Sequence, residues 1–174
     1  YAFWSLLALY LQASFAGQPG WVAQVPLLAF LAIAAGALGC VAGGRASRRL
    51  GERNVALAAL LASGAFCALS PLLFDAPPAV VAAAALLWGA LVVADSPQFS
   101  ALAARHAPRD YVGTALTVQN GIGFLVTVLS IQTLPWVAQA AGWRWAFLWL
   151  LPGPLAGAWA TARLGRAPAD GGAR

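Results

Sequence analysis

The stretch that decides the fold is WVAQVPLLAFLAIAAGALGCVAGG, residues 21–44, followed directly by RASRRLGER, residues 45–53. The first part has no charged side chain and is long enough to cross a bilayer as a helix, which takes about 20 mostly apolar residues. The second part carries 4 arginines. A long apolar run that ends in a cluster of positive charge is typical of a transmembrane helix.

The composition of the whole chain agrees with a membrane protein. Of its 174 residues, 61% are hydrophobic and 9% are charged, against about 45–50% and about 25% in ordinary soluble domains. The net charge is +5, and all 10 basic residues are arginines. These arginines bracket the apolar runs instead of lining one solvated face, so we expect no nucleic-acid partner.

Five further apolar runs, separated by polar segments, complete a set of six expected transmembrane helices. The first run is short and has no initiator methionine, so we expect it to be a helix whose beginning lies upstream. Residues 1–164 are expected to form one all-α transmembrane bundle, and residues 165–174 a disordered cytoplasmic tail. The expected spans are 1–16, 21–44, 54–74, 78–104, 111–137 and 146–162.

The arginines also predict an orientation. Nine of the 10 lie in the loops after the second and fourth spans or in the tail, and only Arg144 lies in the alternate loops. Positive residues are retained on the cytoplasmic side of a membrane. We therefore expect a multi-pass protein of the plasma membrane, the inner membrane in a bacterium, with its arginine-rich loops and C-terminus in the cytoplasm.

Polar side chains at membrane depth are costly and persist mainly where they face a cavity or a partner helix. The third and sixth spans are almost free of them, so we expect these two helices to be peripheral and the third to face lipid. The first, fourth and fifth spans are expected to be central. The candidate residues of a transport path are Asp95, Gln98, Gln119, Asn120 and Gln12.

Asp95 has two interpretations. It is either a protonation or substrate site in a water-filled path, or a structural carboxylate that bonds a helix end or a backbone N–H near Pro97. Gln119 and Asn120 either line a cavity or bond another helix. Both alternatives stay open for each of these residues.

Stripes of small residues mark two helices. Gly113, Thr117 and Gly121 recur at four-residue spacing in the fifth span, which lets another helix approach closely, and we expect ordinary helix packing there. The second span has a similar stripe in the order Ala32, Gly36, Cys40, Gly44.

Motifs of enzyme, metal and cofactor chemistry are absent from the sequence. We expect no enzyme activity, no metal site and no cofactor. The single histidine, His106, lies in an arginine-bearing loop and is expected to be a solvated surface residue.

Four segments of the chain resemble the carboxy-terminal half of major facilitator superfamily transporters. Residues 44–53 are similar to the loop motif that joins the second and third helices of each half in that family. Gly44, Arg49, Gly51 and Arg53 match the motif, whereas Arg48 replaces its aspartate and Glu52 its first base. The other three segments are residues 94–102, 113–124 and 142–147.

The resemblance implies that the chain forms helices seven to twelve of a twelve-helix transporter. Such a protein moves a small solute by alternating access, in which two six-helix halves rock around a site near the bilayer midplane. Proton coupling is common in the family. The implied partners are a small-molecule substrate, protons, the lipid bilayer and an amino-terminal half. The implied cytoplasmic gating-loop motif comprises Gly44, Arg48, Arg49, Gly51 and Arg53.

An alternative keeps the same membrane helices without transport. In this interpretation the chain is a self-contained six-helix membrane scaffold or regulatory protein that binds partners through its small-residue faces.

Overall fold

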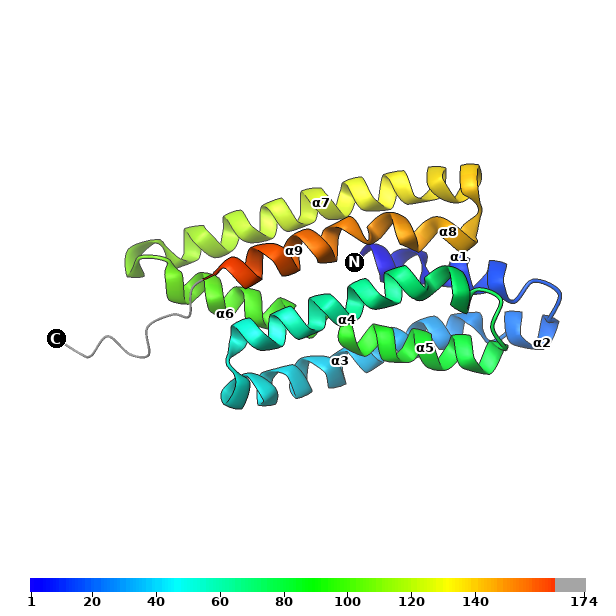
Figure 1. Ribbon diagram of the computed structural model, residues 1–174, viewed down its shortest axis with the longest axis horizontal. Coiled ribbons are helices and arrows are strands. Elements are labelled where there is room, and N and C mark those ends of the chain that lie inside the picture. Colours follow the sequence, from blue (N-terminus) through cyan, green and yellow to red (C-terminus); the bar gives the residue numbers. More distant parts are fainter. Residues whose placement is uncertain (165–174) are drawn as a thin grey trace.

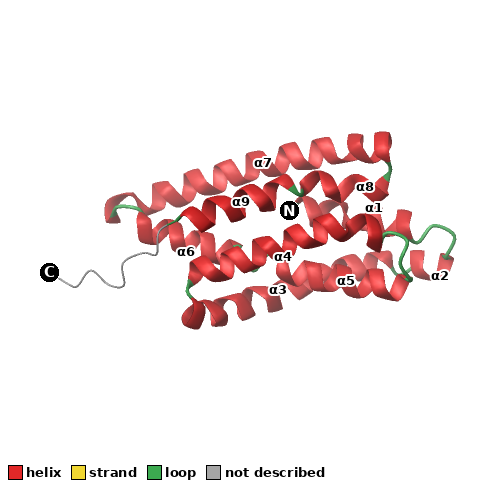
Figure 2. Cartoon of the chain, viewed as in Figure 1, coloured by secondary structure: helices red, strands yellow, loops and turns green. Residues whose placement is uncertain are grey.

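The structure is a computed structural model that describes residues 1–164, and within this range it is all-helical, without a strand (Figures 1 and 2). The expectation of an all-α chain with apolar helices is confirmed. Four segments are long and apolar enough to cross a membrane: Val25–Leu50, Glu52–Leu73, Pro78–His106 and Arg109–Ala141. The helices lie along the long axis of the molecule, with α7 on one edge and α3 and α5 on the opposite edge (Figure 1).

The elements follow one another with short connections. They are α1 (Ala2–Ser14), α2 (Pro19–Val22), α3 (Val25–Leu50), α4 (Glu52–Leu73), α5 (Pro78–Leu91), α6 (Ser96–His106), η1 (Arg109–Tyr111), α7 (Val112–Ala141), α8 (Trp143–Ala146), η2 (Phe147–Leu150) and α9 (Pro152–Arg163).

The predicted loop over residues 45–53 is almost entirely helical. Helix α3 continues to Leu50 and α4 starts at Glu52, so that only Gly51 separates them. Gly51 has a φ of +80°, a conformation that glycine adopts without a Cβ clash. Arginine, alanine and leucine are good helix formers, and for this reason the cluster of positive charge does not end the helix.

The fourth predicted span, 78–104, is a broken helix. Helix α5 ends at Leu91 and α6 begins at Ser96, with turns between them. Pro97 is the physical cause, because its ring excludes the carbonyl of Val93 and it has no N–H to bond to it. The sequence analysis did not predict this break.

The fifth and sixth spans also differ from their predicted limits. Helix α7 runs through Pro135 to Ala141, one turn beyond the predicted end. The sixth span is divided into α8, η2 and α9, with the interruption directly before Pro152. The expected tail, residues 165–174, lies outside the described residues.

An aromatic cluster forms the centre of the core. Phe3 and Trp88 lie with their ring centroids 4.5 Å apart, and Tyr10 and Phe147 with theirs 5.1 Å apart. The Tyr10 hydroxyl donates a hydrogen bond of 2.7 Å to the carbonyl of Ser70. The cluster therefore joins α1, α4, α5 and η2 at one depth of the bundle.

Helices α3 and α5 lie so close together that the two contact points, at Gly39 and Gly89, have no room for a side chain. A Cβ added to Gly39 would overlap the carbonyl oxygen of Ala90, and one added to Gly89 would overlap the carbonyl oxygen of Ala32. The small-residue stripe predicted in the second span is thus partly correct. Gly36 contributes to the contact, whereas a Cβ on Gly44 would meet nothing within 4 Å.

Helix α4 is the most enclosed of the four long segments, but it also exposes Leu61, Leu69 and Leu72. The expectation that it is peripheral and faces lipid stays a prediction. Fifty per cent of the apolar window of α4 is buried inside the bundle, against 11% for the segment containing α7. The cause is a face of small side chains. Gly64 lies against Pro154 of α9, and Ser63 accepts a hydrogen bond of 3.4 Å from the indole N–H of Trp88.

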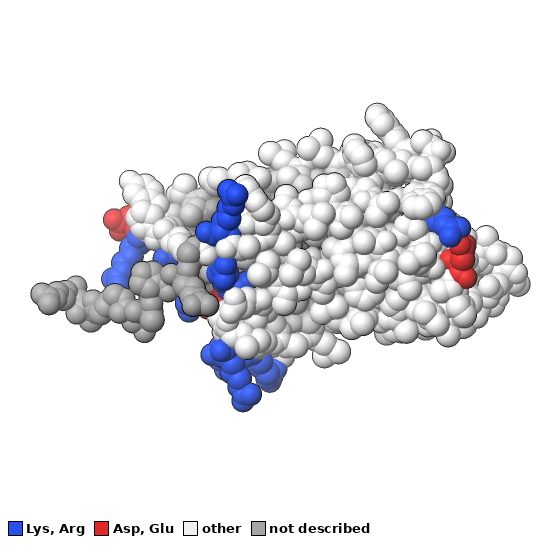
Figure 3. All heavy atoms as spheres, viewed as in Figure 1, with Lys and Arg blue, Asp and Glu red and all other residues white. Residues whose placement is uncertain are grey.

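The arginines at the ends of α3, α6 and α9 gather at one end of the molecule (Figure 3). Arg105 of α6 forms an ion pair of 2.9 Å with Glu52 of α4. Arg53 donates hydrogen bonds to the carbonyl oxygens of Thr161, at 3.1 Å, and Ala162. These contacts connect the start of α4 to the ends of α6 and α9.

Replacing Arg53 by glutamine is expected to lower the stability of the protein by about 1 to 2 kcal/mol, because a guanidinium that donates to two helix-end carbonyls is lost. In detergent, the midpoint of thermal unfolding should fall by roughly 3 to 6 °C. Arg109→Gln is the matched control, because Arg109 is exposed at the same end of the molecule. Equal midpoints for the two variants would show that the Arg53 contacts do not stabilise the bundle.

Candidate functional site

An open groove of about 610 Å³ lies between α6 and α7. Its walls combine aromatic rings with hydroxyl, amide and imidazole groups. The residues that line it are Tyr1, Ser96, Phe99, Ser100, Leu102, Ala103, His106, Gln119, Asn120, Gly123, Phe124, Thr127 and Leu164.

Helical spacing places the polar groups on the two walls of the groove. On α6, Ser96 and Ser100 are four residues apart and share one side of the helix, and His106 lines the groove from the last turn. On α7, Asn120 and Thr127 are seven residues apart, which is two helical turns. The break before Ser96 lets α6 start at a new angle, so that its polar side faces α7.

Two of the five predicted path residues, Gln119 and Asn120, line this groove. The Oε1 atom of Gln119 is buried and has no hydrogen-bond partner among the described residues. A buried acceptor without a partner is costly unless water or a ligand bonds to it. Gln119 is therefore the group in the groove wall that is best placed to accept a hydrogen bond from a solute.

Asp95 lies directly before the groove wall, at the first turn of α6. The Ser96 hydroxyl is 3.5 Å from its Oδ1 atom, and the Asp95 side chain makes no capping hydrogen bond to the helix. The two ion pairs found within residues 1–164 use other carboxylates, those of Glu52 and Asp75. A negative charge at this position interacts favourably with the amino-terminal end of α6.

The other two predicted path residues lie elsewhere. Gln98 is buried, with 2% of its surface exposed, and its Nε2 atom lies near Gly43 of α3. Gln12 is exposed on α1, 11 residues from Tyr1 in the groove wall, or roughly 16 Å along the helix. The structure does not bring either residue to the groove.

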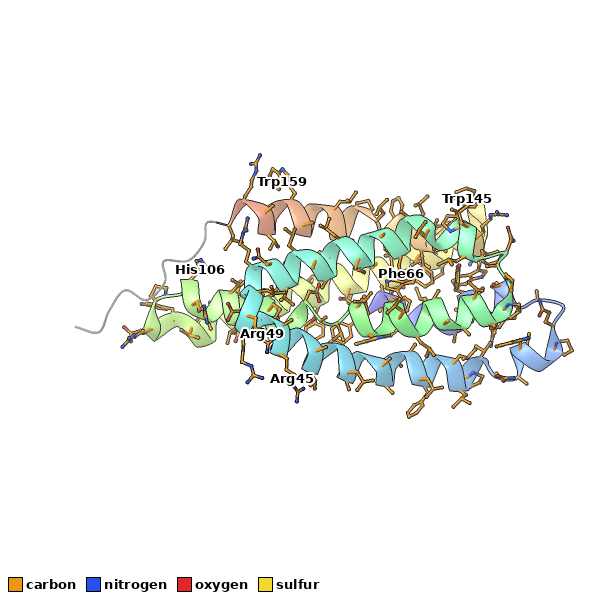
Figure 4. All side chains as sticks on the ribbon, turned by 60° about the horizontal axis from the view of Figure 1, so that its bottom comes forward. Arg45, Arg49, Phe66, His106, Trp145 and Trp159 are labelled. Atoms are coloured by element: carbon orange, nitrogen blue, oxygen red, sulfur yellow. The ribbon has the colours of Figure 1, made fainter. Side chains whose placement is uncertain are left out.

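His106 is the site residue that sequence reasoning missed. It is exposed, lines the groove, and its Nδ1 atom is 2.8 Å from the carbonyl oxygen of Leu102 (Figure 4). The expectation of an exposed residue is confirmed, and the residue lies at the last turn of α6, on the edge of the groove.

The small-residue stripe of the fifth span meets no other helix within residues 1–164, so its expected packing against another helix stays a prediction. A Cβ on Gly113 or Gly121 would meet nothing within 4 Å. Thr117 is exposed and donates a hydrogen bond of 2.9 Å to the carbonyl of Gly113 in its own helix. The three residues of the stripe are all exposed.

The residues of the gating-loop motif have different surroundings. Gly51 forms the sharp connection between α3 and α4, and Arg53 binds the end of α9. Gly44, Arg48 and Arg49 are exposed on the last turns of α3 (Figure 4 labels Arg49). Within residues 1–164, Gly51 and Arg53 are the members of the motif that connect helices.

No group of three or more His, Cys, Asp or Glu side chains within residues 1–164 is arranged to hold a metal ion. Comparisons with known proteins found no matching family model, no matching curated protein and no matching solved structure.

Proposed function

We propose that this chain moves a small solute across a membrane by alternating access, as one six-helix half of a transporter of the major facilitator type. The observation that carries the proposal is the groove between α6 and α7. On one side of the groove are the polar side chains of α6, which is the second part of a broken apolar helix. On the other side are the polar side chains of α7, the least enclosed of the long apolar segments. Broken helices at membrane depth are a recurring feature of transporter binding sites.

The open face of α7 supports a second six-helix unit as the partner. This helix exposes a row of large apolar side chains next to the small-residue stripe at Gly113, Thr117 and Gly121. A continuous row of exposed apolar side chains favours burial against lipid or another helix. The small residues beside it favour contact with another helix. The exposed apolar residues are Val118, Ile122, Phe124, Leu125, Val126, Val128 and Leu129.

The proposed location is the plasma membrane, with the arginine-rich end in the cytoplasm. The clustering of arginines at the ends of α3, α6 and α9 supports this orientation. Arg144, at the opposite end, is neutralised by an ion pair of 2.6 Å with Asp75.

Asp95 is the proposed coupling acid, since it lies beside the groove with no arginine or histidine paired to its carboxylate among the described residues. Gln119 and Asn120 would bind the solute by hydrogen bonds, and Phe99 and Phe124 would contact its apolar part.

Transport by full-length protein in liposomes, with a panel of radiolabelled solutes, tests the proposal. Gln119→Ala should weaken the apparent affinity for the solute about tenfold, which corresponds to one lost hydrogen bond of about 1.4 kcal/mol. Gln132→Ala is the matched control, because Gln132 is exposed on the same helix away from the groove.

Two results would contradict the proposal. The first is that no solute in the panel is moved or bound, which favours the self-contained scaffold. The second is that Gln119→Ala and Gln132→Ala transport with the same affinity, which would remove the groove from the path.

A further inference from the structure

A second groove lies between α3 and α4, with the end of α5 as its floor. It has a volume of about 500 Å³, and its walls are formed only by small and apolar residues. The two helices are connected by Gly51 at one end, and α5 holds them apart along the groove. The lining residues are Leu38, Gly39, Ala42, Gly43, Ala46, Val55, Ala58, Ala59, Ala62, Ala90, Leu91 and Ala94.

Three arginines lie at the end of this groove. Arg45, Arg48 and Arg49 occupy positions i, i+3 and i+4 on the last turns of α3, which puts them on one face of the helix. They line a concavity together with Ala46. Since Ala46 also lines the apolar groove, the two surfaces are continuous (Figure 4 labels Arg45 and Arg49).

The charges of these three arginines are not used inside the described part of the chain. The ion pairs there involve Arg105 and Arg144, and Arg53 binds the end of α9. By contrast, Arg45, Arg48 and Arg49 are exposed. Three like charges on one helix face repel each other unless an anion lies among them.

The outer face of α3 changes from apolar to basic over a short distance. Leu38 is 73% exposed and Val41 is 52% exposed, and Arg45 follows Val41 by about 6 Å along the helix axis. A ligand that fits this face therefore has an apolar chain and an anionic group separated by less than about 10 Å.

We propose that this surface binds an anionic phospholipid, with one acyl chain in the groove between α3 and α4 and the phosphate among Arg45, Arg48 and Arg49. Guanidinium groups bind phosphate oxygens through paired, charge-assisted hydrogen bonds. The small side chains of the groove leave a channel that a hydrocarbon chain fills without a polar contact. This proposal does not depend on the transport function.

Other occupants use only one part of the surface. A soluble phosphate ion would bind the arginines and leave the groove unused, and a partner helix would fill the groove without neutralising the arginines. A lipid with an anionic headgroup accounts for the groove and the charge cluster together.

The test is lipid binding to the full-length protein in detergent, measured by native mass spectrometry with dioleoyl phosphatidylglycerol and, separately, dioleoyl phosphatidylcholine. The wild type should bind the anionic lipid at least tenfold more tightly than the zwitterionic one. The double variant Arg45→Gln/Arg49→Gln should bind phosphatidylglycerol about 30-fold more weakly, at about 1 kcal/mol per arginine. Its affinity for phosphatidylcholine should be nearly unchanged.

Two matched variants complete the design. Arg109→Gln/Arg163→Gln removes the same charge from the same end of the molecule outside the proposed site, and it should bind phosphatidylglycerol like the wild type. Ala58→Phe fills the groove from its exposed side and should weaken binding of both lipids, whereas Ala68→Phe, exposed on the same helix outside the groove, should not.

Three outcomes would overturn the proposal. If the wild type binds the two lipids with equal affinity, the arginines do not form a site for the anionic headgroup. If the two double-arginine variants lose the same affinity for phosphatidylglycerol, the effect is one of net charge. If millimolar inorganic phosphate displaces the lipid and Ala58→Phe binds normally, the site is one for a soluble anion. Size-exclusion profiles identical to that of the wild type show that each variant is folded.

Discussion

Gly39→Val is expected to lower the stability of the protein by at least about 3 kcal/mol, the largest effect of any single substitution proposed for the fold. The added Cβ would overlap the backbone carbonyl of Ala90. A backbone atom cannot move aside as a flexible side chain can, so α3 and α5 must separate. Overpacking of a close contact costs about 1 to 3 kcal/mol, and more where the backbone has to shift.

Gly44→Val is the control for this prediction. Gly44 lies on the same helix, and a Cβ there would meet nothing within 4 Å. Valine has a higher helix propensity than glycine, so the control should unfold at the same temperature as the wild type or slightly above it. Thermal unfolding in detergent, followed by tryptophan fluorescence, measures both variants. If Gly39→Val unfolds together with Gly44→Val, then α3 and α5 do not pack as closely as described.

The limits of the apolar helices could be predicted from the sequence to within a few residues, because hydropathy and arginine placement depend on local composition. The end of α3 could not be predicted in this way. The arginines of residues 45–53 indicated a loop, but arginine is itself a good helix former. The break at Val92–Asp95 was also missed. Pro97 alone does not distinguish a kinked helix from a broken one, and the close contact of α3 with α5 and Ala94 supports the broken form.

The ranking of helices by polarity agrees with the groove at α7, but it did not anticipate how much of α4 is buried inside the bundle. Polarity identifies helices that face water or a cavity, and Gln119 and Asn120 of α7 do line the groove. Polarity does not indicate burial that results from small side chains. Ser63 and Gly64 are such residues, and they allow α4 to lie close to its neighbours. A pattern of Ala, Gly and Ser at helical spacing is therefore a better guide to α4 than its low polarity.

The candidate site was only partly predictable for a related reason. Asp95, Gln119 and Asn120 were found because a carboxylate or an amide at membrane depth is conspicuous in an apolar sequence. Whether Gln98 faces the groove or α3 depends on where α6 starts, and that depends on the break. A side chain at the edge of a discontinuous helix cannot be assigned to one face from periodicity alone.

The break places Asp95 where a change of its charge has little effect on the fold. Its carboxylate makes no capping hydrogen bond, and its nearest described partner is the Ser96 hydroxyl at 3.5 Å. Asparagine has the same shape, and it also accepts hydrogen bonds. The loss of a charge at a helix amino terminus costs about 0.3 to 1 kcal/mol. Asp95→Asn should therefore unfold within roughly 3 °C of the wild type.

Transport by the same variant should fall at least tenfold. In the proposed function, Asp95 binds and releases a proton beside the solute groove, and an amide cannot do so. The pH dependence of solute uptake into liposomes should also disappear in Asp95→Asn while the wild type retains it. Asp110→Asn is the control, because Asp110 lies in η1 at the arginine-rich end and is exposed; its uptake and pH dependence should match those of the wild type.

The two measurements together separate the two interpretations of Asp95. Lost transport with unchanged stability identifies a coupling or substrate-binding acid, because only chemistry at the groove has changed. A stability loss of several kcal/mol, with transport reduced in proportion to the folded fraction, would instead make Asp95 a structural residue that holds α6 in place. Unchanged uptake and pH dependence in a stable variant would remove Asp95 from the mechanism, and the proton site would then have to lie outside the described groove.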